Sequence, residues 1–193
     1  MLSDLETNGC FLIKNFVDPH TINIISKYME NKIRREEWLP TLNQLKDGTQ
    51  VTSEYEYYAD PLIEVLLDKY LPEIETLCNK ELLPTYSYTR IYMEKDTLTK
   101  HFDRDPCEYS VTISVASVGE MSCINTGYKG IESAHELAPG DALFYKGCEV
   151  EHWRDTLQPG QMVVQFMLHY VDKNGPWASF KYDRREMLGC KKV

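Results

Sequence analysis

Residues 84–103 read PTYSYTRIYMEKDTLTKHFD, and this stretch decides the fold. Its first part alternates strictly, so that every second side chain lies on one face of an extended chain: Tyr86, Tyr88, Arg90 and Tyr92. Such alternation predicts a strand whose two faces meet different surroundings. The stretch ends on His101-Phe102-Asp103, whose first and third side chains point to the same side when the chain is extended.

The same period of two recurs further along the chain. Four more strands are expected, over residues 109–117, 142–145, 151–154 and 162–171, and the apolar run Phe11-Leu12-Ile13 is a short strand candidate near the start of the chain. Turn signals separate them, among them Pro139-Gly140-Asp141 and Pro159-Gly160. Several short strands with regular turns indicate a sandwich or a barrel, and a jelly roll is one way to close such strands.

The part of the chain before about residue 83 has a helical rhythm instead. Asp18-Pro19 and Asp60-Pro61 each resemble an N-cap followed by proline at the first helical position. Helices are therefore predicted over about 19–36 and about 61–79, with Pro72 bending or restarting the second. The expected apolar faces are Ile22, Ile25, Met29 and Ile33 in the first helix, and Leu62, Val65, Leu66 and Tyr70 in the second.

Composition restricts the class of partner. The formal net charge of -9 disfavours nucleic acid and anionic membrane surfaces, because affinity for both comes mostly from Lys and Arg. The six cysteines form no CxxC pair, so they are expected to be reduced thiols in a cytoplasmic protein. We predict no secretory signal, and no apolar run approaches the ~20 residues of a membrane span.

The His101-Phe102-Asp103 segment has the chemistry of a metal site. On a strand, its two outer Cα atoms lie about 6.6 Å apart, at ~3.3 Å per residue, which lets both side chains reach one ion. A third ligand is available at His152, at the start of another predicted strand. Two imidazoles and one carboxylate form a facial triad that suits Fe(II) and leaves metal positions open.

These residues together resemble the 2-oxoglutarate/Fe(II) dioxygenases of the prolyl 4-hydroxylase type. The resemblance covers nearly the whole chain and rests on Tyr92, His101 and Asp103, the segment 139–145 and His152. It implies a double-stranded β-helix (jelly-roll, cupin-like) core with N-terminal helices packed outside. It also implies Fe(II) held by His101, Asp103 and His152, with 2-oxoglutarate and O₂ as cosubstrates and ascorbate as a further candidate.

The chain departs from that family at two positions. The family has an Arg or Lys ten residues after the second histidine, to bind the distal carboxylate of 2-oxoglutarate, and Met162 stands there. Arg154 is the preferred substitute, with Arg90 second, and Tyr92 matches a family tyrosine that lines the cosubstrate pocket. A glycine usually follows that tyrosine by three residues, and Lys95 replaces it.

The expected plan is a single oxygenase domain over 1–193, with a largely helical part (1–83), a jelly-roll core (84–172) and a tail (173–193). Loops at about 40–56 and 118–136 are expected to frame the mouth. The expected substrate is a small molecule or a peptide, such as a prolyl side chain or a free amino acid. Two alternatives stay open: a cupin-type metalloprotein that does not use 2-oxoglutarate, and a non-catalytic jelly-roll binding module. The sequence does not indicate an oligomeric state.

Overall fold

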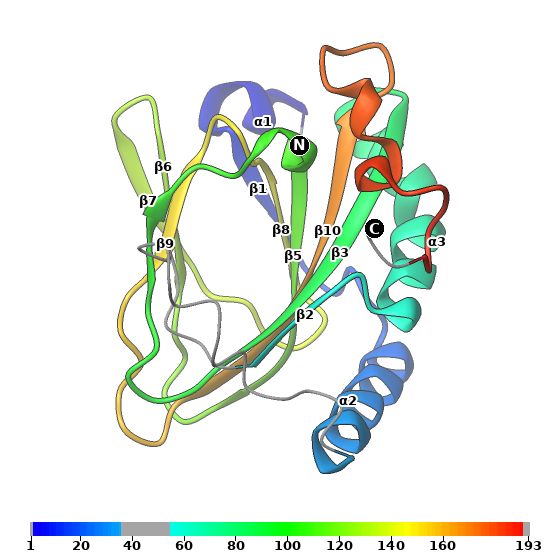
Figure 1. Cartoon of the computed structure of the whole chain (residues 1–193). Helices are drawn as coiled ribbons and strands as arrows, with labels where there is room; N and C mark the ends of the chain where they lie inside the picture. Colours follow the sequence, from blue (N-terminus) through cyan, green and yellow to red (C-terminus); the bar gives the residue numbers. More distant parts are fainter. Residues whose placement is uncertain (1, 36–54, 191–193) are drawn as a thin grey trace.

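Two antiparallel sheets face each other across the interior of the molecule in a computed structural model that describes residues 2–35 and 55–190 (Figure 1). The major sheet has six strands in the order β1 (Cys10–Ile13), β8 (Ala142–Lys146), β5 (Tyr109–Val118), β10 (Met162–Asp172), β3 (Leu82–Tyr92) and β2 (Tyr55–Tyr58). The minor sheet has four, in the order β4 (Leu98–His101), β9 (Glu151–Arg154), β6 (Ile124–Tyr128) and β7 (Ile131–His135). This arrangement is the double-stranded β-helix that the sequence predicts, with helices outside it.

The helices cover the outer face of the major sheet (Figure 1). They are α1 (Leu2–Asn8), α2 (Pro19–Arg34) and α3 (Pro61–Cys78), and the short 3₁₀ segments are η1 (Asp105–Cys107) and η2 (Ala178–Arg184). The predicted N-caps are confirmed, since Asp18 accepts hydrogen bonds from two backbone N–H groups at the start of α2 and Asp60 does the same for α3. No helix in the described part of the chain is long and apolar enough to cross a membrane.

The predicted apolar face of α3 is partly wrong. Val65 is 62% exposed, whereas Ile63, Leu67 and Ile74 are fully buried against the sheet. Apolar residues stand at most positions between 62 and 67, so periodicity alone does not choose between two faces about 100° apart. The helix also continues through Pro72 without a restart. At the end of α2, Ile33 is 39% exposed and Lys32 is buried in its place.

The two faces of the major sheet differ in polarity, and the polar face points inward. On β5, Val111, Ile113 and Val115 pack in the cluster that includes the helices. The side chains that alternate with them, Ser110, Thr112 and Ser114, are buried on the opposite face. Buried polar groups are costly unless they are bonded. A polar face buried between two sheets therefore marks the interior as the place to look for a functional site.

Five elements were not predicted from the sequence: α1, β2, β4, β6 and β7. The expected loop at 118–136 is mostly the hairpin of β6 and β7 in the minor sheet. This region was misread because β7 is exposed along nearly its whole length and shows no apolar alternation. The other expected loop, at 40–56, lies outside the described residues except for 55–56, which belong to β2.

Candidate metal centre

Neighbouring strands of the minor sheet bring two histidines together. His101 is the last residue of β4, His152 lies in β9, and the two are direct partners in the antiparallel register. Their ring centroids are 4.2 Å apart. The chain leaves β4 after His101, and the backbone N–H of Asp103 then donates to the carbonyl of Gly147 at 2.9 Å. That bond turns the Asp103 side chain back toward the two rings.

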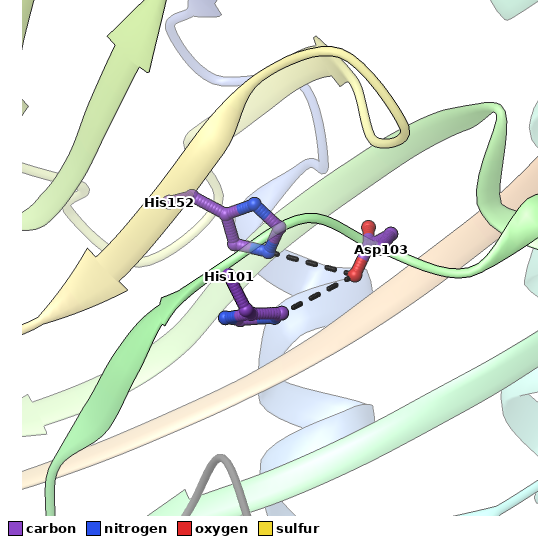
Figure 2. Close-up of side chains that lie close together, drawn as sticks. All are labelled: His101, Asp103 and His152. Atoms are coloured by element: carbon purple, nitrogen blue, oxygen red, sulfur yellow. Dashed lines mark ion pairs between the residues drawn. The ribbon is translucent and has the colours of Figure 1, made fainter.

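The three side chains converge on one point (Figure 2). Asp103 Oδ1 lies 3.7 Å from His101 Nε2 and 3.5 Å from His152 Nε2. The Nδ1 atoms face backbone carbonyls, of Thr99 at 2.8 Å and of Val150 at 3.0 Å. A carbonyl only accepts, so each Nδ1 carries the proton and each Nε2 presents its lone pair to the common point.

The electrostatics of this cluster favour a bound cation. Burial by itself raises the pKa of the Asp103 carboxyl, but the neighbouring histidines, His152 first, together outweigh burial, and the pKa of Asp103 lies below its ordinary value. Burial and then the neighbouring His152 lower the pKa of His101. Burial also opposes the charged form of His152, yet Asp103 raises its pKa above the usual value. One carboxylate and two imidazoles thus share a confined space. A divalent cation bound there would interact favourably with the negative charge of the carboxylate.

Two further residues, Ser110 and His169, support Asp103, a role that sequence reasoning did not identify. Ser110 Oγ donates to Asp103 Oδ2 at 2.9 Å and lies 2.9 Å from His169 Nδ1. Burial lowers the pKa of His169 to about 4, so its ring is neutral. The only signal for these residues in the sequence is that each lies on the inward face of its strand.

A cavity of about 240 Å³ opens from the candidate metal centre along the barrel interior. The three converging side chains form one part of its wall. Residues from β3 and β10 form much of the rest, namely Tyr86, Tyr88, Arg90, Tyr92, Gln165, Met167 and His169. One face of strand β3, which carries Tyr86, Tyr88, Arg90 and Tyr92, therefore lines a cavity beside the converging side chains.

Arg154 lies deeper than His152 on the same strand and is 2% exposed. Its guanidinium donates to the carbonyls of Ser122 at 2.8 Å and Cys123 at 3.1 Å, and to Gln165 Oε1 at 2.9 Å. All these acceptors are neutral, and Arg154 Nε has no hydrogen-bond partner. Burial lowers the pKa of Arg154. The guanidinium carbon lies 5.2 Å from the centre of the Tyr92 ring, and Tyr92 and Gln165 separate Arg154 from the cavity.

Arg90 has a different environment. It lines the cavity directly, but its Nη2 forms an ion pair with Glu56 of β2 at 2.5 Å and donates to Tyr88 Oη at 3.2 Å. Its Nε is also buried without a partner. Both guanidinium groups lie near the Tyr92 ring, since that of Arg90 is 5.8 Å from the same ring centre.

The structure also shows the environment of Met162, the backbone conformation of Lys95 and the partner of Arg104. Met162 is on the outer face of β10, where it lines a groove with Met29 of α2, so its side chain points away from the metal centre. Lys95 adopts φ 72°, in the left-handed region that favours glycine. Arg104, directly after Asp103, pairs with Asp183 of η2 at 3.3 Å.

The architecture has many relatives of known structure. A prolyl 4-hydroxylase from Pseudomonas putida superposes with a TM-score of 0.65 at 14% identity, over 87% of this chain and 96% of that one. SnoK, a non-haem α-ketoglutarate-dependent carbocyclase from nogalamycin biosynthesis, gives 0.71 at 13%, over 89% and 82%. HygX from Streptomyces hygroscopicus, solved with nickel, 2-oxoglutarate and hygromycin B bound, gives 0.66 at 12%, over 90% and 86%. No protein-family model and no curated protein matches the chain.

Proposed function

We propose that the chain is a non-haem Fe(II) oxygenase that couples the oxidative decarboxylation of 2-oxoglutarate to the hydroxylation of a substrate. The observation that carries the proposal is the meeting of His101, Asp103 and His152 inside a double-stranded β-helix, with both Nε2 atoms turned toward the carboxylate. The solved structures that share this fold include enzymes whose descriptions name iron or 2-oxoglutarate.

The residues present fit a bound Fe(II). Two imidazole nitrogens and one carboxylate oxygen are the donors of a facial triad, and the ligand atoms of the three residues lie within 4.8 Å of one another. The carbonyls of Thr99 and Val150 fix the tautomers that leave Nε2 available. Fe(II) bound there would supply O₂ activation, with 2-oxoglutarate as the source of electrons.

Arg154 is our candidate for binding the distal carboxylate of 2-oxoglutarate. A buried cation without a counter-charge is unfavourable. Among buried Lys and Arg side chains in the described ranges, Lys32 pairs with Asp60 and Arg185 pairs with Glu64. Arg154 has only neutral acceptors there. The distal carboxylate of 2-oxoglutarate, reaching Arg154 beyond Gln165 and Tyr92, would provide the missing negative charge. The Tyr92 phenol can donate a further hydrogen bond to this carboxylate.

Arg90 is the second candidate for the same task. It lines the cavity, which favours it, but an ion pair with Glu56 already neutralises it. For 2-oxoglutarate to bind Arg90, its carboxylate would have to share or displace Glu56. For this reason we rank Arg154 first, and the experiment below separates the two.

The remaining cavity wall would orient the substrate. Tyr86, Tyr88 and Phe102 give it aromatic surface, and Arg104 lies at its edge. We propose a peptide side chain, prolyl among them, or a free amino acid as the class of substrate, with the cavity shielding the reacting C–H group from water. The metal triad and these side chains do the positioning, while the cosubstrates carry the oxidation.

The test is an anaerobic titration of the protein with Fe(II) and then 2-oxoglutarate, monitored by the visible charge-transfer band of the iron–oxoacid chelate. The wild type should develop the band, and a His101→Ala/Asp103→Ala variant should not. Arg154→Met should bind Fe(II) normally but weaken 2-oxoglutarate roughly 10- to 100-fold, the loss expected for a charge-assisted hydrogen bond. Arg90→Met is the matched variant and should keep the wild-type affinity.

Each contrary result has a definite meaning. If Arg90→Met rather than Arg154→Met loses 2-oxoglutarate, Arg90 binds the carboxylate. If Fe(II) binds and no band forms, the protein is a cupin-type metalloprotein that does not use 2-oxoglutarate. If no metal binds, the barrel is a non-catalytic module.

A further inference from the structure

A buried serine contacts the carboxylate of Asp103, and a buried histidine contacts that serine. Ser110 is 0% exposed and His169 is 5% exposed, and they lie on the adjacent strands β5 and β10 as direct partners. Ser110 Oγ is 2.9 Å from Asp103 Oδ2 and 2.9 Å from His169 Nδ1. The His169 ring is held in turn by Tyr86, with ring centroids 4.6 Å apart.

Hydrogen-bond chemistry gives this chain a direction. A serine hydroxyl has one proton to donate. Donation to the Asp103 carboxylate is the charge-assisted and therefore stronger choice. Ser110 must then accept from His169, so the proton of the His169 ring is on Nδ1. The order is His169 Nδ1–H to Ser110 Oγ, and Ser110 Oγ–H to Asp103 Oδ2.

As a consequence, the two carboxylate oxygens of Asp103 have different surroundings. Oδ2 is occupied by Ser110, while Oδ1 faces His101 and His152. Gly147 leaves the space that Oδ2 occupies, because a Cβ added there would lie 2.6 Å from it. We propose that Ser110 and His169 are positioning residues that restrict Asp103 to one-oxygen coordination, and this inference rests on the metal site proposed above. One-oxygen coordination leaves more metal positions open for cosubstrates.

A second metal ion is the competing explanation for the same group. One ligand atom each from Asp103, Cys107 and His169 also lies within 4.8 Å of the others. However, Ser110 already bonds to Asp103 Oδ2 and to His169 Nδ1, which occupies one potential ligand atom of each residue. Cys107 Sγ lies 3.0 Å from Tyr86 Oη, so the sulfur also has a protein partner. These contacts favour a positioning network over a second ion.

The experiment measures metal affinity and metal geometry, without turnover. Native protein and variants would be titrated anaerobically with Fe(II), and with Co(II), whose visible spectrum reports coordination number. We expect Ser110→Ala to weaken Fe(II) roughly 10- to 100-fold, as is typical when a residue that supports a metal ligand is lost, and to change the Co(II) spectrum. Ser110→Thr keeps the hydroxyl and should restore both properties.

Two further variants separate positioning from folding. Ser114→Ala removes a buried hydroxyl from the same strand and face, away from Asp103, and should leave both readouts unchanged. His169→Asn keeps a donor toward Ser110 and should retain more Fe(II) affinity than His169→Phe. Thermal unfolding of each metal-free variant shows whether it is folded, and if Ser110→Ala is not, the two His169 variants decide the question.

Three results would overturn the inference. The first is a Ser110→Ala variant with native Fe(II) affinity and an unchanged Co(II) spectrum. The second is a second equivalent of Co(II) that Cys107→Ala abolishes. In both cases the native protein still binds metal, so the proposed function stands. The third is a native protein that binds neither metal, which would remove the proposed function as well.

Discussion

At the scale of single residues, Gly147 lies against the candidate ligand Asp103 and leaves no room for a side chain. A Cβ added there would lie 2.1 Å from the Cys107 carbonyl oxygen as well as 2.6 Å from Asp103 Oδ2. The carbonyl of Gly147 also accepts from Asp103 N. One backbone position thus contacts both the main chain and the side chain of a candidate ligand.

We therefore expect Gly147→Ala to reduce Fe(II) affinity by roughly tenfold or more, since Asp103 must move. Gly127→Ala is the control, because its Cβ would meet no atom closer than 3.6 Å. Isothermal titration of both variants with Fe(II) under anaerobic conditions measures the effect. Equal affinity for the two variants would show that the Asp103 loop adapts freely.

The candidate ligands were accessible to sequence reasoning because two of them share a short motif at the end of β4 and the third lies near the start of β9. Their supporting residues were not. Ser110 and His169 are 59 residues apart, and Glu56, the partner of Arg90, is 34 residues away from it. Such contacts depend on strand order and register, which local alternation does not specify. Arg90 and Arg104 likewise pair with residues distant in the sequence, Glu56 and Asp183.

At the scale of elements, the strands with a clear apolar alternation and the helices with Asp-Pro starts were predicted well. The strands missed were short, exposed or at an edge. β4 has only four residues, two of them exposed, and its pairing with β9 is irregular. β2 is the edge strand of the major sheet, and all four of its residues are partly exposed. Such segments form strands because a neighbour pairs with them, which a local pattern does not reveal.

The two Asp N-caps make an element-scale comparison. Asp60 is fully buried, and besides capping α3 it pairs with buried Lys32 and accepts from Tyr28. Asp60→Ala should reduce the free energy of unfolding by about 3–5 kcal/mol, because it removes the buried carboxylate that pairs with buried Lys32. Asp18→Ala removes an exposed cap and should cost clearly less. Urea denaturation of both variants tests the ranking, and equal losses would contradict it.

The turn that leads into β8 gives a pH-dependent prediction. Asp141 is 3% exposed and accepts from Lys14 Nζ at 2.8 Å, Asn15 N at 3.0 Å and Ala138 N at 3.0 Å. Burial opposes its charge, but these donors outweigh burial and lower the pKa of Asp141. A lowered pKa means that the stabilisation is present above the unfolded-state pKa and is lost as the pH falls through the folded-state pKa.

Asp141→Asn should therefore reduce the free energy of unfolding at pH 7 by about 1.5–3 kcal/mol. The difference from wild type should shrink as the pH falls below about 4, where the native carboxyl is protonated too. Urea denaturation at both pH values provides the measurement. A difference that does not change with pH would assign the effect to shape rather than charge.

At the scale of the whole molecule, the segment after β10 is attached to α3 and to the major sheet. Arg185 and Glu64 form an ion pair with side chains 1% and 2% exposed, and Arg185 also donates to the carbonyl of Thr85. Three consecutive residues before Arg185, Tyr182 to Arg184, have positive φ, which is unfavourable for side chains other than glycine. The buried pair therefore maintains a conformation that the local sequence disfavours.

Arg185→Ala should lower the free energy of unfolding by about 3–5 kcal/mol, because Glu64 is left buried without its counter-charge. Arg184→Ala, at the exposed neighbouring position, should change it by no more than about 0.5 kcal/mol. Chemical denaturation of the two variants gives the comparison. A small effect of Arg185→Ala would mean that water reaches Glu64 when the arginine is absent.

The direct succession of Asp103 and Arg104 has one more consequence. The first residue faces the metal position and the second pairs with Asp183 in η2, so adjacent residues of one backbone connect the ion site to the C-terminal segment. If metal binding makes docking of the C-terminal segment through Arg104 more favourable by some factor, thermodynamic reciprocity requires that the docked segment raises the affinity for the metal by the same factor. Amide hydrogens of 178–190 would then exchange more slowly with Fe(II) present, and the Asp183→Asn substitution would make their exchange insensitive to the metal.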